Sequence, residues 1–358
     1  MQHIGIKLAL LIFLSFPFAN GKADHIPTNI TGGLGYAGGG INSESGVTLG
    51  KGNVAIGFRM DFQKFEKRSD AKFEELGAAD PSADLHTTES ILSPSLNAAI
   101  GVTDDLSVGF TVPWIFRENV TDIHDGDTVV QLGDVEGIGD TTVFGQYRFF
   151  HSEQTDSYAS SMLGATQTHV STIFGVKAPT GRKNKKSDTF FADGEFKKER
   201  FEAELQPGSG SWDFLLGLAA TQMYGPITWS TSAVYNFVNE GSQHTDLGDI
   251  ISYNTALAYR LDGDLFASSL IGSSLGLFDN VNVDLILELN GEFRDKEQTN
   301  GSDDDNSGGN LLFIAPGLRM SGGGLSAAVS GGFPISTDLN GDQVEPDFRV
   351  TGVISFVF

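Results

Sequence analysis

The chain has 358 residues, a formal net charge of −23, no cysteine, and a high content of glycine (45 residues) and phenylalanine (27 residues). So acidic a chain lacks the lysine- and arginine-rich surface that nucleic acid requires, which excludes nucleic acid as an expected partner. The absence of cysteine excludes a disulfide framework, so stability must come from the fold itself.

The N-terminal residues 1–23 have the three parts of a secretory signal peptide. Lys7 supplies a positive charge, residues 8–18 are mostly apolar, and the small residues that follow allow cleavage after Gly21 or after Ala23. The apolar run is too short to cross a bilayer of about 30 Å as a helix. We therefore expect residues 1–23 to be removed after export, and the sequence leaves both cleavage positions open.

Residues 24–52 form a glycine-rich N-terminal segment without clear alternation. Such a segment either hangs in the periplasm or folds into the lumen of a barrel, and both alternatives remain open here. After the signal peptide, no segment reaches the run of about 20 apolar residues that a membrane helix needs. If the mature chain spans a membrane it must therefore form a closed barrel, the other backbone arrangement that satisfies its hydrogen bonds inside lipid.

Alternating segments between residues 53 and 358 predict the strands of such a barrel. In 281–293, for example, apolar and polar residues occupy alternate positions, as the period of two in a strand requires. An even number of strands returns the C-terminus to the periplasm. We therefore predict an all-β fold, a single 12-stranded antiparallel transmembrane β-barrel over residues 53–358. The predicted strands are 53–63, 89–101, 105–116, 140–150, 169–178, 212–223, 227–238, 249–260, 281–293, 311–320, 324–334 and 347–358.

The connections between these strands alternate in length. Short turns are predicted at 102–105, 224–226 and 321–323, as is typical of the periplasmic end of an outer-membrane barrel. The connections 151–168 and 261–280 are longer than this rule predicts, and the second is apolar. The long, polar connections expected outside the cell are 64–88, 117–139, 179–211, 239–248, 294–310 and 335–346.

The last predicted strand ends on an aromatic residue. Phe356 and Phe358 lie on its apolar face, whereas Arg349 and Thr351 lie on the opposite face. A terminal strand of this kind resembles the signal that the barrel-insertion machinery recognises in bacterial outer-membrane proteins. We therefore expect Phe356 and Phe358 to be the assembly signal, with the insertion machinery and the lipid bilayer of a Gram-negative outer membrane as partners.

Five short sequence motifs lie in order along the predicted strands and turns. They are 42–52 (NSESGVTLGKG), 101–114 (GVTDDLSVGFTVPW), 137–149 (GIGDTTVFGQYRF), 175–181 (GVKAPTG) and 287–291 (LELNG). Together they resemble the outer-membrane transporter family named for the MetA pathway of phenol degradation, from about residue 41 to the end. The resemblance implies a barrel, uptake of small, aromatic or apolar molecules, and no catalytic residues. The basic-then-acidic loop 182–204 and the aspartate-rich tip 303–305 depart from that pattern.

Charged residues within the predicted strands fall on the face opposite the apolar one. A charge facing lipid at mid-bilayer would cost about 2–4 kcal/mol, so we expect these residues to line the lumen. There they either form a salt-bridge network that fills a narrow barrel or surround a water-filled pore and tune its selectivity. The predicted pore-lining residues are Arg59, Asp61, Arg148, Lys177, Asp213, Arg260, Asp284, Glu288, Glu292, Arg319, Asp347 and Arg349.

No arrangement typical of catalysis is apparent. Most histidines of the mature chain fall in predicted loops, and none lies on a strand near a serine with an obvious orienting group. Residues 338–342 place oxygen side chains at alternate positions, but the calcium-loop pattern fails at its twelfth position, Arg349. We expect no enzyme, cofactor or metal. The predicted function is an outer-membrane channel for a small-molecule substrate, and the alternative is a non-transporting structural or adhesive barrel.

Overall fold

A computed structural model describes residues 34, 39–79, 85–124, 128–154, 166–192, 194–261 and 281–358. The predicted signal peptide and most of residues 24–38 lie outside the described residues. So do the connection at 262–280 and residues 155–165.

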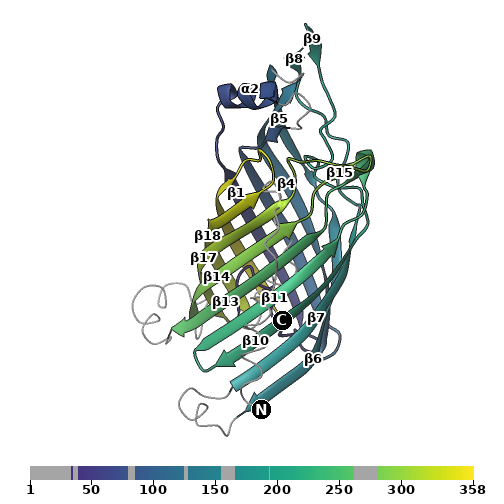
Figure 1. Ribbon diagram of the computed structural model, residues 1–358. Coiled ribbons are helices and arrows are strands. Elements are labelled where there is room, and N and C mark those ends of the chain that lie inside the picture. The colour runs from purple at the N-terminus through teal and green to yellow at the C-terminus, as the bar shows by residue number, and fades with distance from the viewer. Residues whose placement is uncertain are drawn as a thin grey trace.

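Twelve antiparallel strands close into a barrel whose strands are strongly tilted (Figure 1). The ring is complete because β1 pairs with both β3 and β19, and because the first half of β4 pairs with β6. Every predicted segment overlaps one of these strands, so the predicted 12-stranded barrel is confirmed. In ring order the strands are β1 (Val54–Phe65), β3 (Ser90–Gly101), β4 (Leu106–His124), β6 (Thr141–Gln154), β7 (Thr166–Ala178), β10 (Asp213–Tyr224), β11 (Ile227–Phe237), β13 (Ile250–Leu261), β14 (Asn282–Arg294), β17 (Gly309–Gly322), β18 (Leu325–Leu339) and β19 (Pro346–Val357).

The strands present apolar side chains outward and polar side chains inward. In β1, Ile56, Phe58 and Met60 are 43–46% exposed, whereas Arg59 between them is 4% exposed. A soluble protein buries the first kind of residue and exposes the second. The reversed arrangement is the one that a closed barrel adopts when lipid surrounds it.

One end of the barrel carries tight turns. Residues 225–226 join β10 to β11, and Gly323 and Gly324 join β17 to β18. Both glycines have positive φ, +57° and +85°, as both central residues of a type I′ hairpin turn require. These turns confirm the predicted short connections, and we call this end of the barrel the short-turn end.

The other end, the long-loop end, is more structured than expected. The predicted polar loop at 117–139 was wrong: β4 continues beyond the barrel and β5 (Thr128–Ile138) returns along it. The helix α2 (Asp70–Ala79) stands nearby at the same end (Figure 1). The hairpin exists because its apolar residues bury one another and the following loop in a small core. The members of this loop core are Val120, Val130, Leu132, Val135, Phe190, Ala192, Phe201 and Leu205.

Shorter elements complete the long-loop end. β8 and β9 form a hairpin, and β12, β15 and β16 form a three-stranded sheet. Among the described residues, no helix is long and apolar enough to cross a membrane. The bounds of the shorter elements are β2 (His86–Thr87), β8 (Phe190–Ala192), β9 (Glu195–Lys197), η2 (Ser242–His244), β12 (Thr245–Asp246), β15 (Gln298–Thr299) and β16 (Ser302–Asp303).

Candidate functional site: the lumen and its plug

A segment of the chain that precedes β1 lies inside the barrel. Residues 39–50, here called the plug segment, lie mostly buried and hydrogen bond to inward-facing groups around the wall. Of the two alternatives that the sequence left open, this part of the glycine-rich segment therefore folds into the lumen. The strands it bonds are β1, β4, β6, β7, β10, β11, β14, β17 and β18.

The carboxylate of Glu288, on β14, is the main acceptor for the plug segment. Its two oxygens accept hydrogen bonds from the backbone N–H of Asn42 at 3.0 and 3.1 Å and from the Asn42 side-chain amide at 2.9 Å. The backbone N–H and the hydroxyl of Ser43 donate to it at 3.1 and 2.9 Å. Glu288 is 1% exposed, so this carboxylate is satisfied almost entirely by the plug segment.

Two arginines of the wall bind the carbonyls of the same segment. Arg59 on β1 donates to the carbonyl of Ile41 at 2.9 Å and forms an ion pair with Asp61 at 2.7 Å. Arg319 on β17 donates to the carbonyls of Gly39 and Gly40 at 2.9 and 2.7 Å. Glu288 and the hydroxyls of wall serines and threonines therefore accept from the plug N–H groups, and wall arginines bind several of its carbonyls. An irregular backbone is satisfied inside a barrel in this way.

Two glycines of the plug segment allow it to lie against the wall. A Cβ at Gly46 would approach the backbone oxygen of His169 to 2.5 Å, and one at Gly40 would overlap the Glu288 carboxylate at 1.8 Å. Neither separation is possible for real atoms. The glycine content of this segment therefore reflects close approach to the strands around it.

A cavity of about 60 Å³ lies next to the plug segment, on its long-loop side. Asn42 and Glu44 line it from the plug segment, and Arg59, Glu292 and Arg349 line it from the wall. An apolar cavity of about 150 Å³ binds benzene. The open space is therefore too small for a ring and suits a few water molecules.

Glu292 and Arg349 face this cavity with part of their bonding capacity unused. Neither carboxylate oxygen of Glu292 has a hydrogen-bond partner among the described residues, and its nearest cation is Arg294 at 3.7 Å. The guanidinium of Arg349 lies 4.0 Å above the ring of Phe313, and its Nε donates to Gln63. These groups can bind water or a polar group of a molecule that enters from the long-loop end.

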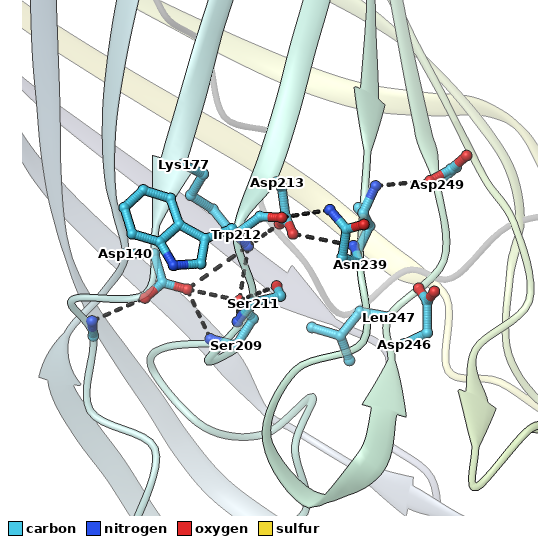
Figure 2. Close-up of polar contacts among 12 residues, drawn as sticks. Asp140, Lys177, Ser209, Ser211, Trp212, Asp213, Asn239, Asp246, Leu247 and Asp249 are labelled. Atoms are coloured by element: carbon cyan, nitrogen blue, oxygen red, sulfur yellow. Dashed lines mark hydrogen bonds and ion pairs between the residues drawn. The ribbon is translucent and has the colours of Figure 1, made fainter.

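A second polar network holds the rim of the barrel at the long-loop end (Figure 2). The ammonium of Lys177 on β7 pairs with Asp213 on β10, lies 3.7 Å from Asp140, and donates to the hydroxyl of Ser209 at 2.9 Å. Asp140 also accepts from the backbone N–H groups of Gly181 and Ser209, both at 2.8 Å. The network therefore ties both ends of the loop 179–211 to the wall.

The acidic side of this rim continues toward β12 (Figure 2). Asp213 accepts from the backbone N–H of Asn239 at 3.2 Å, and Asp249 accepts from the Tyr235 hydroxyl at 2.6 Å. Burial, together with the nearby carboxylates, raises the pKa of Asp246 above its ordinary value. This side of the rim is therefore acidic, with the ammonium of Lys177 among the carboxylates of Asp140, Asp213, Asp246 and Asp249.

The short-turn end carries further charge pairs. Arg148 on β6 pairs with Asp105 at 2.7 Å. Arg260, at the end of β13, pairs with Asp284 of β14 at 2.9 Å, and Arg319 lies 3.9 Å from the same carboxylate. Each of these cations has a carboxylate partner, so the charges of this end largely neutralise one another.

The structure thus groups most of the predicted pore-lining residues. Arg59, Asp61, Glu288 and Arg319 surround the plug segment, Glu292 and Arg349 face the cavity, and Lys177 and Asp213 meet at the rim. Arg260 is exposed but paired, and Asp347 is exposed near the start of β19. Asn42, Ser43 and Asp140 also belong to the site, although they were not among the predicted residues. The signal available for them was their place in two of the family motifs, 42–52 for Asn42 and Ser43 and 137–149 for Asp140.

A closed barrel with an apolar outer face and a charged, plugged lumen is an outer-membrane-type β-barrel. Of three similar solved structures, the first supports this fold. The COG4313 outer membrane channel from Pseudomonas putida F1 is 15% identical, with a TM-score of 0.50 over 87% of this chain and 97% of that chain. The β domain of the Bordetella autotransporter BrkA gives a TM-score of 0.40 at 9% identity, covering 86% and 98%. The P. putida toluene transporter TodX gives 0.39 at 7% identity, covering 94% and 99%.

The sequence comparison is more specific. The model of the family described as "Putative MetA-pathway of phenol degradation" matches residues 82–284, more than half of the chain. The chain belongs to this family, which confirms the resemblance drawn from its sequence phrases. No curated protein matches the chain in sequence.

Proposed function

We propose that this protein is an outer-membrane channel for small molecules, including aromatic or apolar ones, rather than an enzyme. The observation that carries the proposal is the construction of the lumen. A single continuous segment, residues 39–50, occupies its short-turn half and is held there by hydrogen bonds to the wall strands and by apolar packing of Ile41 and Leu49. Membership of a family named for phenol degradation supports the substrate class. A Gram-negative outer membrane is the location that the fold supports.

The way through the barrel follows from this construction. A molecule that enters from the long-loop end meets Glu292 and Arg349 and then the plug segment at Asn42 and Glu44. The cavity at that point is smaller than an aromatic ring, so passage requires the plug segment to move. Hydrogen bonds exchange with water at a net cost of about 1 kcal/mol each, so water can replace the many polar contacts of the plug segment when it moves. The bonding of the plug segment therefore suits a removable barrier.

The alternative is a barrel that transports nothing and presents its loops as a structural or adhesive surface. In that case the plug segment is a permanent filler that keeps the wall charges satisfied. The two functions differ in one measurable property, because only a channel passes ions or solutes when the plug segment is displaced.

Planar-bilayer recording of the refolded mature protein tests the proposal. Openings above the bilayer background are expected, together with faster uptake of radiolabelled phenol by porin-deficient cells that carry the protein than by matched cells with an empty vector. Silent bilayers and unchanged uptake, from protein shown to be folded by heat-modifiable gel mobility, would favour the non-transporting barrel.

The C-terminal strand supports a related proposal about assembly. Phe356 of β19 and Phe358, directly after this strand, are 41% and 58% exposed, so a second protein can reach them during insertion. Phe358→Asp is expected to lower the amount of protein in the outer membrane severalfold without reducing export. The measurement is immunoblotting of membrane and periplasmic fractions, with Glu74→Asp, an exposed position of the helix α2, as a control. Equal membrane levels of F358D and wild type would contradict the role of Phe358.

A further inference from the structure

Outside the lumen, at the long-loop end, three side chains that can bind metal converge. They are His86 on β2 and the carboxylates of Glu202 and Glu204 in the loop that follows β9. One donor atom from each lies within 4.8 Å of the other two, although His86 is more than 110 residues away from the two glutamates in the sequence. No local motif in the sequence joins these residues, and no metal was expected from it.

The distances between the donor atoms suit a shared ion better than direct bonding. His86 Nδ1 lies 3.7 Å from Glu204 Oε1 and 3.9 Å from Glu202 Oε2. Both separations exceed a hydrogen bond. Two ligands held at about 2.0–2.1 Å from a tetrahedral zinc ion are about 3.3–3.4 Å apart, so a small inward movement of each side chain would complete the geometry.

The surrounding fold holds two of the ligands in place. Pairing of β2 with β4 positions His86 opposite Asp122, and its side chain is 9% exposed. Glu204 is 3% exposed, and its backbone carbonyl accepts from Arg117 at 2.8 Å. Phe201 and Leu205, on either side of the two glutamates, are anchored in the loop core.

The third ligand faces solvent. The side chain of Glu202 is 47% exposed, which gives an ion a route to the site and leaves room for a water ligand. One imidazole nitrogen and two carboxylates make a borderline donor set of the kind that zinc accepts, and such a set is poorer for calcium, which prefers six to eight oxygens.

We propose that His86, Glu202 and Glu204 bind a divalent transition-metal ion, best matched by Zn²⁺, with water as the fourth ligand. The ion would join β2 to the loop 201–206 at the outer mouth of the barrel. Binding requires the neutral imidazole and both carboxylates, so the affinity falls as the pH is lowered and His86 takes up a proton.

Zinc titration of the refolded mature protein, prepared without a histidine tag, tests this site. One saturable Zn²⁺ ion per barrel is expected by competition with a chromophoric chelator, and Co²⁺ at the same site should give visible absorption bands. Loss of a ligand should weaken binding at least about tenfold in His86→Gln and in Glu202→Gln, because even second-shell changes cost that much. The matched control is His244→Gln, which removes a histidine paired at 3.0 Å with Glu240 alone on the same end of the barrel.

Each result decides the proposal. Binding that persists in H244Q and is weakened in both ligand variants supports the site. Absence of saturable binding by the wild type, or equal affinity in wild type, H86Q and E202Q, overturns it. Should H86Q fail to refold, E202Q still decides, because its altered side chain is half exposed and its amide is nearly isosteric with the carboxylate.

Discussion

The two halves of the lumen are filled in different ways. Toward the short-turn end, the plug segment occupies the interior, and the wall charges Arg59, Glu288 and Arg319 bind its backbone. Toward the long-loop end, wall charges meet one another or face the cavity, as Lys177 with Asp213 and Glu292 with Arg349 show. Charges of the same kinds therefore serve two purposes: in one half they hold a removable segment, and in the other they hold the wall and rim loops.

This difference assigns transport control and stability to separate residues. Changes at the plug contacts should alter conductance more than stability, because the barrel wall remains paired. Changes at the rim should alter stability more than conductance, because the loop 179–211 depends on them. The following predictions test that separation.

The largest effect is expected when the plug segment is fixed in place. The hydroxyls of Ser45 and Thr221 lie 3.2 Å apart, and the chain has no cysteine of its own, so Ser45→Cys with Thr221→Cys can form a single defined disulfide. Oxidation should abolish openings in planar bilayers, and a reductant should restore them. The single variants S45C and T221C serve as controls. Undiminished openings in the oxidised double variant would show that solutes bypass the plug segment.

A large effect in the opposite direction is expected from Glu288→Ala. The variant removes the acceptor for four donors of Asn42 and Ser43. A hydrogen bond to a charged group contributes at least about 1.5 kcal/mol, so the loss of two such bonds costs about 3 kcal/mol. This cost would raise the population of molecules with a displaced plug segment on the order of 100-fold. Single-channel recording should show a longer open time. Glu136→Ala, an exposed site on β5, is the control, and equal open times in the two variants would contradict the role of Glu288.

An intermediate effect, on stability, is expected from Lys177→Met. The carboxylates of Asp140 and Asp213 are 5% and 6% exposed and would lose their cation. Leaving buried carboxylates without a partner should lower the free energy of unfolding by about 3 kcal/mol, measured by urea titration in detergent. The double variant K177M with Asp213→Asn should recover part of the loss. Unchanged open times are expected in both variants, and an increase in open time as large as that of E288A would contradict the proposed separation of roles.

The smallest effect is expected from the acidic ladder of β14. Asp284 is paired with Arg260 and approached by Arg319, and Glu288 is bound by the plug segment. Only Glu292 faces open space. The triple change Asp284→Asn, Glu288→Gln and Glu292→Gln should therefore shift the reversal potential in a salt gradient slightly toward anions at low ionic strength. Glu292→Gln alone should give most of that shift, and a larger contribution from Asp284 would mean that its pairing is absent in the open channel.

The barrel itself could be predicted from the sequence because apolar and polar residues alternate along each strand, which shows which face meets lipid and which face meets the lumen. Each strand places apolar residues toward lipid and polar residues inward, so the strand positions and the facing of residues such as Arg59 and Glu288 follow from a period of two. The short turns follow for a similar reason, since the Gly323–Gly324 turn needs a backbone conformation that glycine adopts freely.

Contacts between distant segments could not be predicted in this way. Nothing in residues 39–50 alternates, because an irregular segment bonded on all sides has no preferred face. The hairpin of β4 and β5 was missed because its polar residues dominate the composition of 117–139. Its signals were the alternating Val130 and Leu132 and the Asp125-Gly126 pair, a sequence typical of hairpin turns. The convergence of His86 with Glu202 and Glu204 depends on the loop fold and leaves no local trace.

The bond between Asn42 and Glu288 joins residues 246 positions apart. A ribosome and an export channel deliver Asn42 long before Glu288, and contacts of such high sequence separation form late in folding. The plug segment therefore lacks its main hydrogen-bond acceptor until β14 has been exported. Closure of the ring, which needs β1 to pair with β19, requires export of the last strand. Binding of the plug segment in the lumen and pairing of β1 with β19 are thus both late steps of assembly. We therefore expect the plug segment to enter the lumen at about the time the ring of strands closes.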